Sequence, residues 1–266
     1  MCVKCDFNRR GFTRLGLGLA AASLLRAHGA RAATPLPLVM IDPGHGGHDP
    51  GAIAPDGLFE KHITLATGLT LRESLLATGR YRVAMTRSTD VYVTLEGRVA
   101  DAIAADADLF LALHCDHLPA ANLRGASVFT LSGTASDALA AGIATDENSV
   151  DNGPAPEFNG VSPQVAGILA SLETRATQLG SDTLAQDIQA AFTGVVPLLP
   201  DPHRSANFAV LRDPSTPSAL LEMGCLSNPR DEARLKDPAH RQLIAQRLTG
   251  AIDHYFTNTA RIRMAG

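Results

Sequence analysis

The chain has 266 residues, of which 45% are hydrophobic, and this excludes a disordered polymer and suits one α/β domain with a real core. The formal net charge is −4, but residues 1–32 carry six of the 23 basic and one of the 27 acidic side chains. The remainder therefore holds 17 basic and 26 acidic groups, a net of −9. Such a surface repels nucleic acid and anionic lipid, so neither is an expected partner.

The first 33 residues have the order of an export signal. Basic residues in RRGFTR (9–14) precede an apolar stretch at 15–25 and a small-residue cleavage site at 30–32. The stretch is too short for a permanent membrane span, which needs about 20 residues. The paired arginines with a following phenylalanine resemble a twin-arginine signal, with an ordinary export signal or an uncleaved amphipathic anchor as alternatives. We expect residues 1–33 to direct export to the periplasm.

Apolar runs alternate with segments of helical periodicity along the rest of the chain. In the first half of the chain we expect a strand at 36–41, a loop at 42–59, a helix from 60 to 79, a strand at 81–85, a helix at 94–105, and strands at 109–113 and 126–131. A helix at 136–144 is then followed by an irregular segment at 145–162 that leaves the core. The rest of the chain is expected to form a helix at 165–192 with an interruption near Gly180, short strands at 208–211 and 219–221, and a helix at 239–256. In the helix at 94–105, the residues expected to face inward are Leu95, Val99, Ala102 and Ile103.

This alternation predicts one α/β domain over residues 34–266. Its core is a mostly parallel, twisted sheet of about six strands, covered by helices on both faces. The sequence contains no repeats and no sign of a second domain.

Four polar residues are predicted to meet at one edge of that sheet. His45 and His114 follow two apolar strands, Glu222 ends a third, and Glu60 opens the helix after the first loop. Sites in open α/β sheets form beyond the carboxyl ends of the strands. His45, Glu60 and His114 would supply the three protein ligands of a catalytic zinc site, and Glu222 would act as base and then acid.

Each of these residues also has an ordinary interpretation when it is considered alone. A single His is usually a surface or hydrogen-bonded structural residue, and an acid in the first turn of a helix is favourable without any metal. Other histidines lie close in sequence: His48 and His117 could replace a ligand, His62 should point elsewhere on its helix, and His203 could approach the substrate. The convergence of four such residues on one edge favours the zinc site.

Two cysteines, Cys115 and Cys225, remain after the leader. They could form one disulfide in an oxidising compartment, and the favoured alternative is two small buried residues beside core strands.

Several ordered motifs of the chain resemble one enzyme family. They are IDPGHGG (41–47), DPGA (49–52), EK (60–61), TR (86–87), LH (113–114) and LEMGCLSNP (221–229). Over residues 37–256 the chain is similar to the zinc-dependent N-acetylmuramoyl-L-alanine amidases of the amidase-3 type, including periplasmic cell-division amidases. The resemblance implies Zn²⁺ held by His45, Glu60 and His114, with Glu222 as the catalytic glutamate. It also implies cleavage between N-acetylmuramic acid and L-alanine in peptidoglycan, for wall remodelling and daughter-cell separation.

The resemblance also suggests a regulatory insert at residues 145–168. Division amidases of this family can carry a helix that plugs the zinc site until an activator removes it, and Glu147 or Glu157 could occupy the open zinc position here. A plain solvent loop is the alternative. We therefore expect peptidoglycan and a periplasmic activator as partners. The protein itself is expected to be a monomer.

The competing functions are a zinc peptidase of the stem peptide and an inactive wall-binding protein. The sequence contains neither G-x-S-x-G nor H-E-x-x-H.

Overall fold

The computed structural model describes residues 35–118, 120, 122–151 and 166–265. The predicted leader therefore lies outside the described residues. The described residues contain six strands, which in chain order are β1 (Leu38–Pro43), β2 (Arg82–Met85), β3 (Leu109–His114), β4 (Ala126–Leu131), β5 (Leu198–Ala206) and β6 (Ser218–Glu222). The helices are α2 (Glu60–Ala77), α3 (Leu95–Ala104), α4 (Ala138–Asn148), α5 (Ala166–Phe192), the 3₁₀ turn η1 (Ala209–Leu211), α6 (Pro229–Lys236) and α7 (Pro238–Ala265).

The strands form one six-stranded sheet in the order β2-β1-β3-β6-β4-β5. All neighbouring pairs are parallel except β4 and β6, which are antiparallel. Every residue of β1, β3 and β6 is buried, as expected for central strands that are covered on both faces. The predicted mostly parallel α/β sheet is confirmed.

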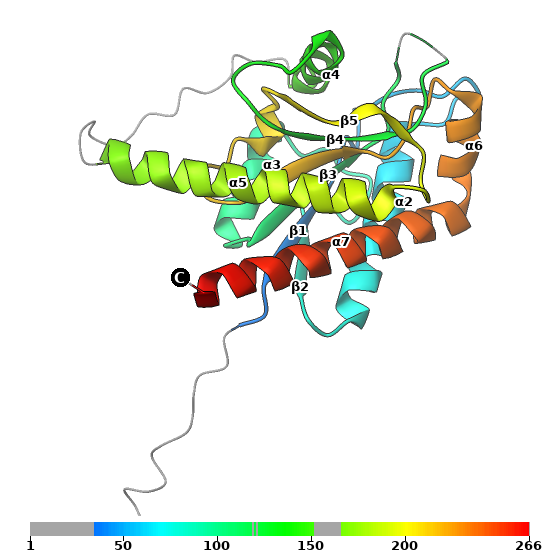
Figure 1. The fold of residues 1–266 in the computed structure, drawn as a ribbon. Helices are drawn as coiled ribbons and strands as arrows, with labels where there is room; N and C mark the ends of the chain where they lie inside the picture. The colour runs from blue at the N-terminus through cyan, green and yellow to red at the C-terminus, as the bar shows by residue number, and fades with distance from the viewer. Residues whose placement is uncertain (1–34, 119, 121, 152–165, 266) are drawn as a thin grey trace, which may run out of the picture. The chain divides into compact units, whose positions relative to one another are not determined.

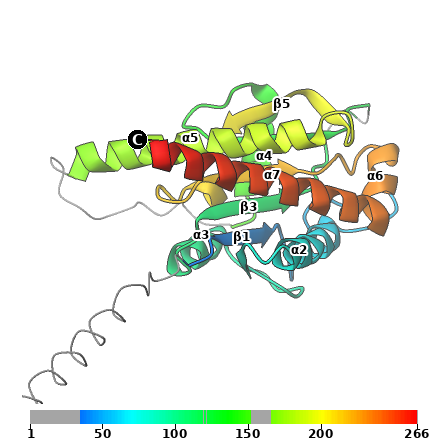
Figure 2. The ribbon, with the colours of Figure 1, turned by 60° about the horizontal axis from the view of Figure 1, so that its bottom comes forward.

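Two hydrophobic clusters lie on opposite faces of this sheet. One contains buried side chains of α2, α5 and α7, and the other contains side chains of α3, α4 and η1. Figures 1 and 2 show α5 and α7 running side by side along the sheet. Within the described residues, no helix is long and apolar enough to cross a membrane.

Four expectations about the elements are wrong. The excursion expected from residue 145 starts only after Asn148, because α4 continues through residues 145–148. Residues 208–211 were expected to form a strand, but Phe208 precedes the 3₁₀ turn η1 and the neighbouring strand is β5. The helix α5 continues through Gly180 without a break. In α3, Ile103 is 50% exposed, while Val99 and Ala102 are buried. A ten-residue helix packs only a narrow stripe against the sheet, and Ile103 lies beyond the edge of that stripe.

Candidate metal centre

The carboxyl ends of β1, β3 and β6 meet at one edge because these strands are parallel neighbours. His114 ends β3 and is in register with Glu222, which ends β6. Pro43 ends β1 and is in register with Leu113, so the loop that carries His45 leaves the sheet beside His114. The strand order thus brings the polar residues that follow three separate strands to one place.

Two buried arginines hold the loop that carries His45. Arg87 donates to the carbonyl oxygens of Pro43 and Gly44, and Arg98 donates to those of Pro43 and His45. Arg98 is itself paired with buried Asp42. His45 adopts a left-handed backbone with φ of 60°, which is uncommon for a residue other than glycine. Such a conformation persists only where the surroundings impose it, as these hydrogen bonds do.

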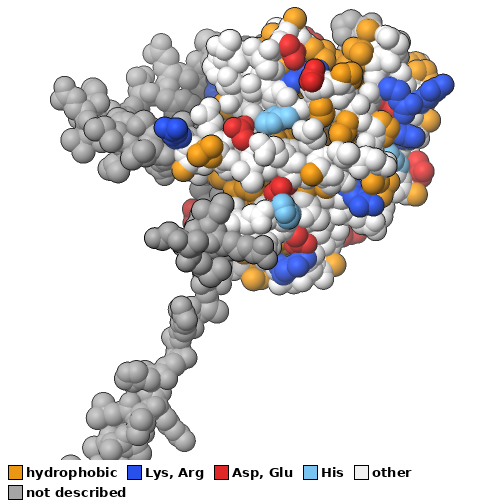
Figure 3. All heavy atoms as spheres, viewed as in Figure 1, with side chains coloured by type: hydrophobic (Ala, Val, Ile, Leu, Met, Phe, Trp, Pro, Cys, Tyr) orange, Lys and Arg blue, Asp and Glu red, His pale blue; other side chains and the backbone are white. Residues whose placement is uncertain are grey.

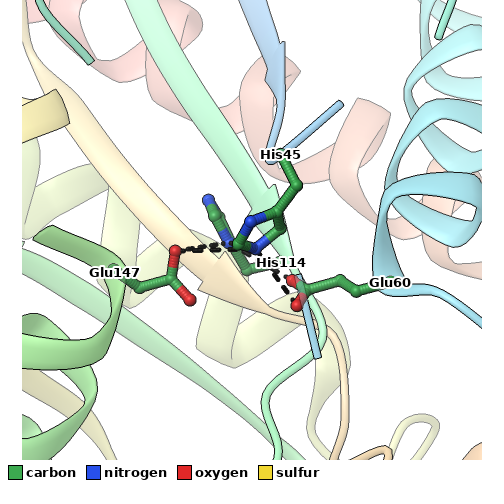
Figure 4. A group of neighbouring side chains, drawn as sticks. All are labelled: His45, Glu60, His114 and Glu147. Atoms are coloured by element: carbon green, nitrogen blue, oxygen red, sulfur yellow. Dashed lines mark hydrogen bonds and ion pairs between the residues drawn. The ribbon is translucent and has the colours of Figure 1, made fainter. Parts of the chain in front are cut away.

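Four side chains converge at this edge, and Figure 4 shows them pointing toward one another. His45 Nε2 lies 3.1 Å from Glu60 Oε2 and 3.2 Å from His114 Nδ1. His114 Nδ1 lies 3.3 Å from Glu60 Oε1 and 3.1 Å from Oε2 of Glu147 in α4. One ligand atom from each of the four residues lies within 4.8 Å of all the others.

These distances fit a zinc ion. Zinc–ligand bonds of about 2.0–2.1 Å at tetrahedral angles separate the ligand atoms by about 3.3 Å. Two imidazole nitrogens and a carboxylate are the usual ligands of catalytic zinc. Glu60 is oriented by two backbone donors, since Cys115 N donates to Oε1 and Ala52 N to Oε2. The residues present therefore match both the ligand chemistry and the spacing of a zinc site.

The pKa values of these side chains depend on the charges of their neighbours in the cluster. Burial alone would lower the pKa values of His45 and His114, but the carboxylates of Glu60 and Glu147 raise both to about 10. Burial alone would raise the pKa of Glu60, but the two imidazoles bring it below its usual range. In the metal-free chain the two histidines thus bind protons where a cation would bind.

Glu222 lies beside this group with both carboxylate oxygens buried and without a hydrogen-bond partner among the described residues. Its pKa is raised well above the usual value by burial and by the charges of Asp116, Glu60 and Glu147. Asp116, which is partly buried, has its pKa raised to about 7 by burial and by the charges of Glu60 and Glu147. Four acids that share so little space would be stabilised by a divalent cation.

Helix α4 closes the group on one side. A cavity of only about 10 Å³ remains between His45, His114 and Glu147, space for roughly one water molecule. On the face seen in Figure 3, acidic, basic and histidine side chains are spread among uncharged ones, so no large patch of one charge marks a site there. The candidate centre is identified by its buried groups.

The other predicted histidines lie elsewhere. His48 and His117 are exposed, and the ring of His48 packs on Tyr92 with 4.1 Å between centroids. His62 contacts Phe59 on the outer side of α2. His203 lies 3.2 Å from the hydroxyl of Thr130, in a polar cleft beside α5 that shares no lining residue with the cavity between His45 and His114.

Cys115 and Cys225 are both buried and free, as the favoured alternative predicted.

Glu147 is the carboxylate of the predicted insert that reaches His45, Glu60 and His114, whereas Glu157 lies outside the described residues. The sequence could name two candidates but could not choose between them, because no periodic pattern determines the path of such a segment.

A family model described as N-acetylmuramoyl-L-alanine amidase matches residues 39–254. The chain belongs to the amidase-3 family. AmiC of Neisseria meningitidis serogroup B is 36% identical over 225 residues, covering 84% of this chain and 53% of that protein. AmiA of Salmonella typhimurium is 36% identical over 220 residues, covering 82% of this chain and 76% of that protein. The chain thus spans about half of the first of these amidases and three quarters of the second.

Solved amidase structures share the fold. The catalytic domain of CwlV from Bacillus (Paenibacillus) polymyxa aligns with a TM-score of 0.59 and 23% identity, covering 84% of this chain and 99% of that one. The CwlD amidase of Clostridioides difficile, solved in complex with the GerS lipoprotein, aligns with a TM-score of 0.61 and 23% identity, covering 83% and 98%. At this identity the likeness supports the amidase fold.

Proposed function

We propose that this protein hydrolyses the amide bond between N-acetylmuramic acid and L-alanine in peptidoglycan with a zinc ion held by His45, Glu60 and His114. The observation that carries this proposal is the close approach, at 3.1–3.3 Å, of the two imidazole nitrogens to each other and to the two oxygens of the Glu60 carboxylate, within an amidase-3 domain. Zinc in such a site acts as a Lewis acid that polarises a carbonyl and activates water near neutral pH.

Glu222 moves the proton in this proposal. Its carboxylate takes a proton from the attacking water and delivers it to the amide nitrogen of L-alanine as the C–N bond breaks. The products are the lactyl carboxylate of the glycan and a free amine on the peptide. A buried carboxylate without a hydrogen-bond partner among the described residues has both oxygens free to take this proton and to hold it until the amine accepts it.

The chemistry is tested on purified peptidoglycan by mass spectrometry. The expected products are peptide-free glycan strands and stem peptides that begin with a free L-alanine. Truncated stems still attached to muramic acid would instead indicate a stem-peptide zinc peptidase, and binding without cleavage would indicate an inactive wall-binding protein. The variant Glu222→Gln should lose about 100- to 10,000-fold in kcat while keeping its zinc; full activity in that variant would contradict the role of Glu222.

We further propose that Glu147 blocks the site in the resting protein. Its Oε2 lies 3.6 Å from His45 Nε2 and 3.1 Å from His114 Nδ1, at the fourth corner of the ligand group. A carboxylate at that corner excludes both water and the substrate carbonyl. The variant Glu147→Ala should therefore be more active than the wild type on peptidoglycan, and equal or lower activity would argue for a plain surface segment.

The biological setting is part of the same proposal. We propose export to the periplasm through the leader at 1–33, with the twin-arginine route as its specific form. Wall remodelling during daughter-cell separation is the expected role. An activator that moves α4 would be the partner of a blocked amidase, and the solved complex of CwlD with GerS is an example of an amidase bound to another protein. Activity that rises with a periplasmic extract would support such a partner.

A further inference from the structure

Helix α4 carries Glu147 into the candidate site, yet it packs weakly against the domain. Its buried side chains are Ala140, Ile143 and Ala144. Two of these are alanines, so the helix removes little apolar area from water. Other contacts must therefore contribute much of the free energy that keeps Glu147 beside the two histidines.

Asp151 provides one such contact, three residues after α4 ends. Its Oδ2 accepts a hydrogen bond from the backbone N–H of Leu95 at 2.7 Å, and its Oδ1 accepts one from the hydroxyl of Tyr92. Leu95 is the first residue of α3, whose free N–H groups and positive dipole end favour a carboxylate. Asp151 thus attaches the chain after α4 to the segment that begins α3.

Asn148, the last residue of α4, provides a second contact. Its Nδ2 donates to the carbonyl oxygen of Asn207 at 2.8 Å, and its Oδ1 accepts from the N–H of Ala209 at 2.8 Å. Asn207 lies in the link between β5 and η1, and Ala209 is the first residue of η1. Two attachments therefore follow Glu147 closely in the chain, one to the start of α3 and one to the start of η1.

We propose that Asp151 and Asn148 form a latch that holds Glu147 in the metal centre, and that activation requires breaking it. The inference rests on the proposed blocking role of Glu147 and adds the residues that set its strength. Asp151 and Asn148 are positioning residues, because they act through Glu147. Each contact is polar and lies near the surface, so a partner can replace it without disturbing the core.

The latch is tested with Tyr92→Phe, which removes only the hydroxyl, and with Asp151→Ala. Loss of a hydrogen bond to a charged group shifts an equilibrium roughly tenfold or more. Each variant should therefore raise basal amidase activity about tenfold, up to the level of Glu147→Ala. In a Glu147→Ala background, Asp151→Ala should add nothing, because the site is already open.

Hydrogen exchange of the backbone amides in 138–148 gives a measurement that does not depend on activity. Exchange in α4 should be about tenfold faster in both latch variants, with the buried part of α5 unchanged. The matched control is Thr70→Ala, which removes a hydrogen bond from a hydroxyl to the carbonyl oxygen of Ala66 within α2 and takes no part in the contacts of Asp151 or Asn148. It should leave exchange in α4 and basal activity at wild-type levels.

The outcomes separate the two proposals. Wild-type exchange in α4 in both latch variants, or the same acceleration in the control Thr70→Ala, would overturn the latch whatever the activity. Faster exchange in α4 with no gain of activity in any variant, Glu147→Ala included, would support the latch as a fastening of α4 and overturn the blocking role of Glu147.

Discussion

Oδ2 of Asp49 lies 2.8 Å from Nδ1 of His45, on the opposite side of the imidazole from Nε2, which faces Glu60. Asp49 is in turn oriented by the N–H of Gly51, which donates to its Oδ1. A carboxylate in this position keeps the proton on Nδ1 and leaves Nε2 free to bind a metal. Asp49 therefore prepares His45 as a ligand without approaching the metal itself.

The variant Asp49→Ala should bind zinc about 10- to 100-fold more weakly than the wild type, because His45 loses the partner that fixes its tautomer and orientation. Competition with a chelator measures the affinity. Asp90→Ala is a suitable control, since Asp90 contacts Gly47 N and Lys61 near the same loop but does not touch the imidazole. If Asp49→Ala and Asp90→Ala bound zinc with equal affinity, Asp49 would stabilise only the loop and would not orient the imidazole of His45.

Zinc binding should release protons. In the metal-free chain the pKa values of His45 and His114 are about 10, so both rings are protonated at pH 7. Binding then displaces about two protons, and zinc affinity should fall by about a hundredfold for each unit that the pH drops below neutrality. Calorimetry in buffers of different ionisation enthalpy counts these protons, and release of fewer than one would be inconsistent with the proposed ligands.

The same two groups set the pH dependence of the metal-free fold. Their folded pKa values lie above the unfolded value of 6.5, so the folded chain binds these protons more tightly. This stabilisation is complete below pH 6.5 and is lost as the pH rises through about 10. The Tm of the chelated protein should therefore fall over that range, whereas the zinc-loaded protein should not share the loss. A flat Tm for the chelated protein would contradict the raised pKa values.

The central sheet and three of the four clustered residues could be predicted from the sequence because their signals are local. Strands that are buried on both faces are continuous apolar runs, and parallel topology then fixes which ends share an edge. In contrast, β5 contains Pro200, Pro202 and His203, and it lies at the edge of the sheet, where proline and polar residues are tolerated. Its sequence therefore resembles a loop.

Helix α6 was missed although its signal is present. Asn228 caps its first turn and Pro229 occupies the first helical position, which is a typical start for a helix. The contact of Glu147 with the histidines depends on how α4 packs, and its fastening by Asp151 joins residues 56 positions apart. Such relationships are tertiary and leave no periodic trace in the sequence.

The variant Arg98→Met should destabilise the zinc-loaded protein by about 3–5 kcal/mol, because it leaves the buried carboxylate of Asp42 without its charged partner. Urea unfolding measures the loss. Arg80→Met is the matched control, since Arg80 is 61% exposed and its pair with Asp253 should contribute no more than about 1 kcal/mol. Similar losses in the two variants would mean that burial of the Asp42 pair is unimportant.

Gly44 leaves the space that the ring of His114 occupies. A Cβ at this position would lie 2.3 Å from Cε1 of His114, far inside van der Waals contact, so the imidazole would have to move. The variant Gly44→Ala should therefore fold with a loss of about 1–3 kcal/mol yet bind zinc at least about tenfold more weakly. Gly133→Ala places the same methyl group where no atom lies within 4 Å, and it should match the wild type in both properties. If Gly44→Ala kept full zinc affinity while folding normally, His114 could not be a ligand in the orientation seen here, because that orientation and a methyl group at residue 44 exclude each other.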